Sequence, residues 1–246
     1  MTDALERLVL PPRYPRPEGV HPPLDSPEYR STALRHPKQP LIDVPQTLGE
    51  LTGPLLGPGR LGELDHDLTR QHPEEPQGQR IIVYGKVLQS GGRPVPDTLV
   101  EIWQANAGGR YRHDGDQHPS PLDPNFTGVG RCITDREGNY KFITIQPGAY
   151  PWGNHPNAWR PAHIHFSLFG PSVRSRLVTQ MYFADDPLHA LDPILSSVPT
   201  EAARARLIAA YDHDVTEPEW ALAWRWDIVL RGAEATPFEA PRDGGR

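Results

Sequence analysis

Cysteine is almost absent from this chain, which has Cys132 as the single cysteine among 246 residues. One cysteine can form neither an internal disulfide nor a cysteine-rich zinc site, and its scarcity fits a reducing compartment. Basic residues are not in excess either, because 25 Lys and Arg stand against 31 Asp and Glu, and no hydrophobic run reaches membrane-spanning length. We therefore expect a cytoplasmic protein that binds neither nucleic acid nor a membrane.

Long helices are not expected, because 30 prolines and 22 glycines interrupt the chain often. Residues 1–79 are rich in proline and polar residues and show no sustained hydrophobic period, so they cannot bury much surface alone. We expect them to form an extended N-terminal arm that packs on the core or on a partner subunit; a disordered arm is the alternative. Residues 80–246 are expected to form the folded domain.

The pattern changes to strands after residue 79. Branched and aromatic residues between glycines and prolines predict strands at 81–87, 98–103, 140–145, 162–169, 177–183 and 224–230. In the last of these, Trp224, Trp226 and Ile228 alternate with residues of the other face. A period of two is typical of a strand with one face against a core.

One short helix is expected near residues 200–211, where Ala203, Leu207 and Ala210 form an apolar stripe. The predicted fold class is therefore all-β: a β-sandwich core with long loops, this short helix and the extended N-terminal arm.

Two histidines, His163 and His165, are separated by one residue in a predicted strand. Residues i and i+2 of a strand point to the same face, so both imidazoles can reach one metal ion. Such a pair occurs in copper, zinc and iron sites, and it can also be a surface pair without a metal. A cupin-type site is a rival interpretation, but it usually adds a glutamate a few residues later, and no carboxylate follows before Asp185.

Tyrosines could complete the coordination of such a metal. Tyr111 and Tyr150 lie in turn-rich loops beside predicted strands, where functional residues concentrate. A phenol has a pKa near ~10 and ionises near neutral pH only beside a strong Lewis acid. Phenolate oxygens combined with imidazoles favour iron(III).

Four segments, taken in order, closely resemble the intradiol ring-cleavage dioxygenases: residues 100–111, 121–131, 147–152 and 159–165. The similarity runs from about Tyr29 to about Phe238. It implies one non-haem Fe(3+) per chain, bound by Tyr111, Tyr150, His163 and His165.

The resemblance also implies roles for residues around the metal. Tyr150 would leave the metal and act as a base, while Tyr111 would stay bound. Arg160 matches a family arginine that stabilises negative charge on the substrate ring, with a surface salt bridge as the alternative. Gln180 matches a family glutamine that lines the same pocket, with an ordinary strand position as the alternative. The residues implied to contact substrate are Tyr29, Trp103, Trp152, Tyr182 and Ile194, and core packing is the alternative for the last four.

The reaction implied by the resemblance is cleavage of protocatechuate (3,4-dihydroxybenzoate) with O2 to 3-carboxy-cis,cis-muconate, in aromatic catabolism through the beta-ketoadipate pathway. A partner is implied as well, the alpha chain of the same enzyme, in a large hetero-oligomer. Three alternatives remain open: a cupin-like metalloenzyme, an intradiol dioxygenase acting on catechol, and an iron-free binding module with the same fold.

Overall fold

The computed structural model describes residues 17–39, 61–170 and 173–238, and strands dominate in them. Its short helices are α1 (Thr32–Arg35), η2 (His189–Leu191), α3 (Pro193–Ser196) and α4 (Glu201–Ala205). No helix of this described part is long and apolar enough to cross a membrane. The strands are β1 (Arg80–Leu88), β2 (Leu99–Gln104), β3 (Val129–Ile133), β4 (Asn139–Ile145), β5 (Tyr150–Pro151), β6 (Trp159–Arg160), β7 (His163–Gly170), β8 (Val173–Phe183), β9 (Ile208–Glu217), β10 (Ala221–Arg225) and β11 (Ile228–Val229).

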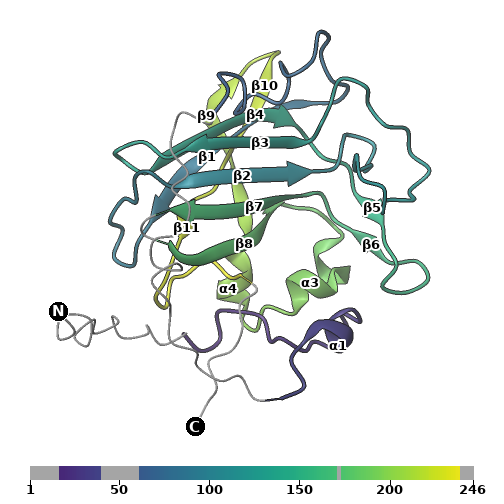
Figure 1. The fold of residues 1–246 in the computed structure, drawn as a ribbon, viewed down its shortest axis with the longest axis vertical. Helices are drawn as coiled ribbons and strands as arrows, with labels where there is room; N and C mark the ends of the chain where they lie inside the picture. The colour runs from purple at the N-terminus through teal and green to yellow at the C-terminus, as the bar shows by residue number, and fades with distance from the viewer. Residues whose placement is uncertain (1–16, 40–60, 171–172, 239–246) are drawn as a thin grey trace, which may run out of the picture.

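The main sheet has the strand order β11-β1-β10-β9-β8-β7-β2-β3, and β4 also pairs with β1. Strand β9 joins two layers of strands, one with β8, β7, β2 and β3 and the other with β10, β1, β11 and β4. Its first residues pair with β8, and its later residues pair with β10. Figure 1 shows β3, β2, β7 and β8 side by side, with β5 and β6 beyond one end of them. This sandwich-like all-β fold confirms the predicted fold class.

The core lies between the layers and is formed by alternate residues of the strands. On β7, Ile164, Phe166 and Leu168 are fully buried, as the period of two requires. The Phe166 ring lies 5.8 Å from the ring of Tyr140 and 4.8 Å from that of Trp226, measured between centroids. Each such side chain stabilises the fold by about 1.5–3 kcal/mol through burial.

The helix predicted near 200–211 is shorter than expected. It begins where a cap was available, since the Thr200 hydroxyl accepts a hydrogen bond from the Ala203 amide at 3.2 Å. It ends at Ala205, and the prediction was wrong for residues 208–211, which belong to β9. Ile208 pairs with Tyr182 in β8, so sheet formation overrides the helical stripe there.

The strand predicted at 224–230 is interrupted and forms β10 and β11, which both pair with β1. Gly85 of β1 lies against the break, because a Cβ atom there would be 1.9 Å from the Trp226 carbonyl oxygen. The Lys86 amide donates to Asp227 Oδ1 at 2.9 Å. A side-chain oxygen thus takes the place of a backbone carbonyl, and regular pairing stops for two residues.

Parts of the predicted N-terminal arm contact the rest of the fold. The Asn154 side chain accepts a hydrogen bond from the Arg30 amide at 2.9 Å and donates one to the Glu28 carbonyl at 2.8 Å. Leu68 is fully buried and its amide bonds to the Ile143 carbonyl at 2.8 Å. Residues 1–16 and 40–60 of the arm lie outside the described residues.

The aromatic core predicts the cost of removing its central ring. Phe166→Ala should lower the free energy of unfolding by about 3–5 kcal/mol, because it leaves a cavity among packed rings. Urea unfolding of the metal-free protein followed by circular dichroism measures this. The matched change Val129→Ala, at a side chain that is 51% exposed, should cost within about 0.5 kcal/mol. Equal losses for both variants would contradict the assigned core.

Candidate metal centre

The register between strands brings the predicted site residues together. On β7, His163 and His165 point away from the core residue Ile164. His165 lies directly opposite Trp103 of β2 and Gln180 of β8, while His163 lies opposite Tyr182 of β8. Residues opposite each other on neighbouring strands share one face. Side chains from three strands therefore meet around the two imidazoles.

Both imidazoles are neutral and able to donate a lone pair. The His163 and His165 ring centroids are 4.9 Å apart. His163 Nδ1 lies 2.7 Å from the Pro161 carbonyl oxygen, which fixes Nδ1 as the hydrogen-bond donor and leaves Nε2 free of its proton. Burial, followed by the charges of Arg160 and His165, lowers the pKa of His163 well below its ordinary value. Burial and then Arg160 lower the pKa of His165 to about 3.

Tyr111 is presented by a loop that polar side chains hold in place. Asn106 Oδ1 accepts hydrogen bonds from the amides of Gly108 and Arg110 at 3.0 and 2.9 Å. Asp116 Oδ2 accepts from the amide of Tyr111 itself at 2.7 Å. These bonds satisfy loop amides that no sheet partner reaches, so the backbone of Tyr111 is fixed.

The loop of Tyr111 touches the loop of Tyr150 through two glycines. Gly109 has φ +77°, and a Cβ atom there would lie 2.2 Å from the Ala149 carbonyl oxygen. A Cβ atom at Gly148 would lie 2.4 Å from the Ala107 carbonyl oxygen. Only glycine permits this approach of the two backbones. The close contact sets the spacing of the two tyrosines.

Four side chains, which we call the ligand cluster, converge as a result: Tyr111, Tyr150, His163 and His165. The Tyr111 ring centroid lies 5.3 Å from that of Tyr150 and 6.3 Å from that of His165. Tyr150 Oη is 3.3 Å from His163 Nε2. The four side chains are thus placed to bind one ion together.

The hydroxyl of Tyr111 tests whether the ligand cluster fits a metal. It is buried and makes no hydrogen bond of normal geometry with any residue that the structure describes, an expensive state for a polar group. Burial, with a smaller effect of Tyr150, raises the pKa of Tyr111 well above its ordinary value. Such a phenol ionises only beside a strong cation, and the neutral imidazole of His165 lies near it. The donor set therefore fits a hard, highly charged metal ion.

Arg160 is at the centre of a buried polar group beside the ligand cluster. Its side chain is only 3% exposed, so it is not a surface salt bridge. Nη2 donates to Gln180 Oε1 at 2.6 Å, to the Tyr182 hydroxyl at 2.8 Å and to Asp192 Oδ2 at 2.8 Å. Nη1 lies 3.1 Å from His163 Nε2. We call Arg160, Gln180, Tyr182 and Asp192 the Arg160 cluster.

Arg160 keeps its positive charge in this buried environment. Burial acts to lower the pKa of the guanidinium, but Tyr182 and Asp192 outweigh it, so the net shift is upward. Arg160 therefore stays a fixed cation next to the ligand cluster.

Other residues predicted to contact substrate lie around the same place. Trp103 stacks on His165 with 4.7 Å between centroids, and Tyr29 meets Trp152 edge-on at 5.6 Å. The guanidinium of Arg160 lies over the Trp152 ring at 5.7 Å. Ile194 is linked to the Arg160 cluster through its backbone amide, which donates a hydrogen bond to Asp192 Oδ1 at 3.0 Å. Contact of these residues with a substrate stays a prediction.

Asp192 is the residue of this site that sequence reasoning missed. The signal available was the pair Asp192-Pro193, a typical helix start, and Asp192 does cap α3. Its bond to Arg160 joins residues 32 positions apart in sequence and has no local signature.

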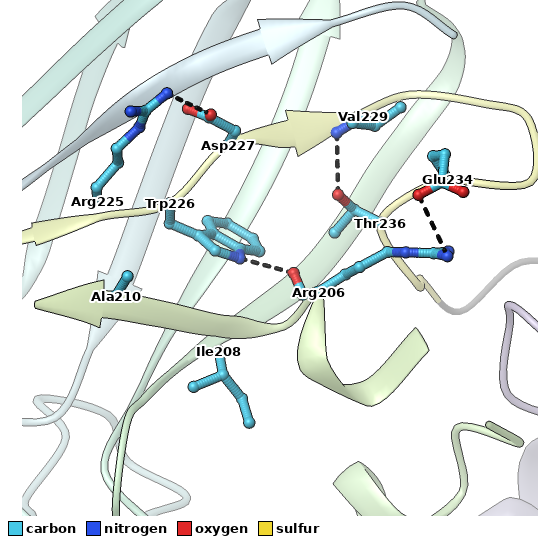
Figure 2. Close-up of a pocket in the computed structure, with 9 residues that line it drawn as sticks. All are labelled: Arg206, Ile208, Ala210, Arg225, Trp226, Asp227, Val229, Glu234 and Thr236. Atoms are coloured by element: carbon cyan, nitrogen blue, oxygen red, sulfur yellow. Dashed lines mark hydrogen bonds and ion pairs between the residues drawn. The ribbon is translucent and has the colours of Figure 1, made fainter. Parts of the chain in front are cut away.

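A separate hollow of about 270 Å³ lies between β9, β10 and the segment after β11 (Figure 2). Its charged residues are satisfied within the hollow, because Arg206 pairs with Glu234 and Arg225 pairs with Asp227. None of the residues predicted for the metal site lines it.

Comparison with known proteins agrees with this geometry. The family model described as "Dioxygenase" matches residues 51–232, and "Protocatechuate 3,4-dioxygenase beta subunit N terminal" matches residues 14–47. The chain is 58% identical to the protocatechuate 3,4-dioxygenase beta chain of Burkholderia cepacia, over 92% of this chain and 96% of that protein. It is 29% identical to the alpha chain of that enzyme from Pseudomonas putida, over 81% of this chain and 98% of that protein.

Among solved structures, 3-chlorocatechol 1,2-dioxygenase from Rhodococcus opacus 1CP matches with a TM-score of 0.52 and 25% identity, over 72% of this chain and 69% of that one. A family model covering most of the chain and a relative at 58% identity over nearly its full length lead to the same assignment. The chain belongs to the intradiol ring-cleavage dioxygenase family.

Proposed function

We propose that this chain is the iron-binding catalytic subunit of an enzyme that cleaves protocatechuate with O2 to 3-carboxy-cis,cis-muconate, a step of aromatic catabolism in the beta-ketoadipate pathway. One observation carries the proposal: four donors converge around the buried hydroxyl of Tyr111, which has no hydrogen-bond partner among the described residues, in a chain 58% identical to a protocatechuate 3,4-dioxygenase beta chain. The identity of 58% to that protein, compared with 25% to 3-chlorocatechol 1,2-dioxygenase, favours protocatechuate over catechol as substrate.

The proposed cofactor is one non-haem iron(III) per chain, held by the ligand cluster. Its contribution, when bound, is that of a Lewis acid that binds and polarises the substrate diol. Two imidazoles and two phenolates suit this ion better than copper or zinc, because phenolate oxygens are hard ligands.

The two tyrosines differ in their surroundings, which supports different roles. Tyr111 has a buried hydroxyl and a backbone held by Asp116. Tyr150 lies in the two-residue strand β5, and its hydroxyl is 3.3 Å from His163 Nε2. We assign Tyr150 Oη as the atom that accepts a proton from a substrate hydroxyl, and Tyr111 as the ligand that stays in place.

In this proposal, Arg160 acts on the bound substrate and Gln180 helps to orient Arg160. A fixed guanidinium stabilises negative charge that develops on an activated ring, at little cost in reorganisation. Gln180 Oε1 accepts from Arg160 Nη2 at 2.6 Å and so helps to aim it. The flat faces of Trp103, Trp152 and Tyr29 suit an aromatic ring, with Tyr182 and Ile194 completing the predicted contacts.

Assembly, location and domain organisation complete the proposal. We propose an alpha chain as partner in a large hetero-oligomer, supported by the match of this chain to both the beta and alpha chains named above. A cytoplasmic location is supported by the single free cysteine. We propose residues 1–79 as an arm on a catalytic domain of residues 80–246, supported by the contacts of Glu28 and Arg30 with Asn154.

Colour tests the ligand set. Protein loaded with iron(III) should be wine-red through charge transfer from tyrosinate, and a chelator should bleach it. Tyr111→Phe should shift or weaken the band, while Tyr211→Phe, at a side chain that is 46% exposed, should leave it unchanged. Visible spectra with parallel iron analysis measure this. A colourless protein with one iron per chain would rule out tyrosinate ligation.

The base role of Tyr150 predicts slow substrate binding in Tyr150→Phe. Loss of a positioned base should slow the spectral change on anaerobic addition of protocatechuate by roughly 10²-fold. Stopped-flow absorbance gives the rate, with Tyr211→Phe as the matched control. A binding rate equal to that of the wild type would refute the role.

Substrate preference tests the reaction itself. With the alpha chain co-expressed, kcat/KM for protocatechuate should exceed that for catechol by at least roughly tenfold, the scale of losing one favourable contact. Oxygen uptake and product absorbance over a panel of catechols measure the preference. A higher kcat/KM for catechol would replace protocatechuate by the runner-up substrate.

A further inference from the structure

Asp192 is a fully buried carboxylate outside the ligand cluster. It is the cap of α3, and it joins this short helix to the Arg160 cluster. We infer that Asp192 is a positioning residue, which holds the Arg160 guanidinium beside the ligand cluster and ties it to the first turn of α3. The inference rests on the proposed function, because it concerns the residue assigned to the substrate ring.

The two oxygens of Asp192 have different partners. Oδ1 accepts a hydrogen bond from the Ile194 amide at 3.0 Å. Oδ2 accepts from Arg160 Nη2 at 2.8 Å and from the Tyr182 hydroxyl at 3.0 Å. One rigid carboxylate therefore sets the distance between the guanidinium and the segment that carries Ile194.

Hydrogen-bond capacity in the Arg160 cluster depends on this carboxylate. Arg160 Nη2 has two hydrogens and the Tyr182 hydroxyl has one. The side-chain oxygens that receive them belong to Asp192, to Gln180 and to the Tyr182 hydroxyl. Of these acceptors, only the carboxylate is charged, and charge-assisted bonds are the stronger ones.

The buried charges of Arg160 and Asp192 also support the positioning role of Asp192. Arg160 is 3% exposed and Asp192 is 0% exposed, so water screens neither of them. A buried guanidinium beside an iron(III) site would be repelled by the metal and would also lose its hydration. Asp192 supplies the opposite charge at 2.8 Å. It therefore allows a cation to be kept next to another cation.

When a metal is bound, Arg160 would lose its contact with His163 and would depend more on Asp192 to hold its position. Arg160 Nη1 lies 3.1 Å from His163 Nε2, whose single lone pair is the one a metal would use. A hydrogen bond and a metal bond to that lone pair exclude each other. With the metal in place, the contacts of Nη2 remain to hold the guanidinium.

Asp192→Asn separates positioning from capping. Asparagine is as good a helix cap as aspartate, so the start of α3 is preserved, but the charge on Arg160 is no longer balanced. We expect kcat per bound iron to fall roughly tenfold to a hundredfold, as displaced groups do, with a smaller change in KM and an unchanged iron content. Steady-state kinetics with the alpha chain and iron analysis measure this.

The matched control is Asp67→Asn, which also removes a buried carboxylate. Asp67 is 5% exposed and accepts from the amide and hydroxyl of Thr69, at 3.0 and 2.6 Å. We expect this variant to keep kcat per iron. Equal kcat per iron in Asp192→Asn and in the wild type would overturn the inference, as would equal losses in the two variants.

A double-mutant cycle on chelator-treated protein gives a readout that needs neither metal nor substrate. Arg160→Gln should lower the Tm by roughly 10 °C, because it leaves the Asp192 charge buried without its cation. Adding Asp192→Asn to Arg160→Gln should restore part of this loss, whereas Asp192→Asn alone should lower the Tm. Additive losses would mean that Asp192 stabilises the fold without acting through Arg160, and would overturn the inference.

The two readouts keep this inference distinct from the proposed function. If wild-type protein with iron and the alpha chain cleaves no catechol, the proposed function fails, while the Tm cycle still decides whether Asp192 acts on Arg160. If Asp192→Asn does not fold, the double variant decides: recovered folding supports the inference, and continued failure overturns it.

Discussion

The register of β7 against its two neighbours is the constraint on which the site depends. It places Trp103, His165 and Gln180 in one row across three strands, and His163 opposite Tyr182. A slip of one residue would turn both histidines into the core and bring Ile164 to the site. The register is secured by burial, since Ile164 and Phe166 are fully buried on the opposite face. Core packing and site geometry are therefore one requirement.

The polar residues of the site then have to satisfy one another. Arg160 is buried and finds a carboxylate, an amide oxygen and a hydroxyl within 2.8 Å. The Tyr111 hydroxyl is buried as well, but it has no hydrogen-bond partner in the described part of the chain. A fold that provides three acceptors for one cation and none for a neighbouring phenol leaves a specific gap in its hydrogen bonding. The proposed metal ion would give the Tyr111 oxygen the partner that it lacks.

Much of this could be predicted from sequence because it rests on local patterns. Strands rich in branched residues and the spacing of His163 and His165 carry their own signal. Strand β9 does not, because it contains Asp212, His213 and Asp214, which are unusual in a strand, and it forms by pairing with β8 and β10. The role of Asp192 beside Arg160 was not predicted for a similar reason. Its capping of α3 is a local interaction, but its ion pair with Arg160 is formed by the tertiary fold.

The two kinds of backbone in the site have different mechanical consequences. The histidines lie on a long strand paired on both sides, so their positions follow the sheet. The tyrosines lie on loops that meet through Gly109 and Gly148, and Tyr150 pairs only through the short strand β5 with β6. That pairing sets Tyr150 opposite Arg160. Any movement of the Tyr150 side chain therefore takes place beside the buried guanidinium of Arg160, which is consistent with the proposal that Tyr150 leaves the metal while its surroundings stay fixed.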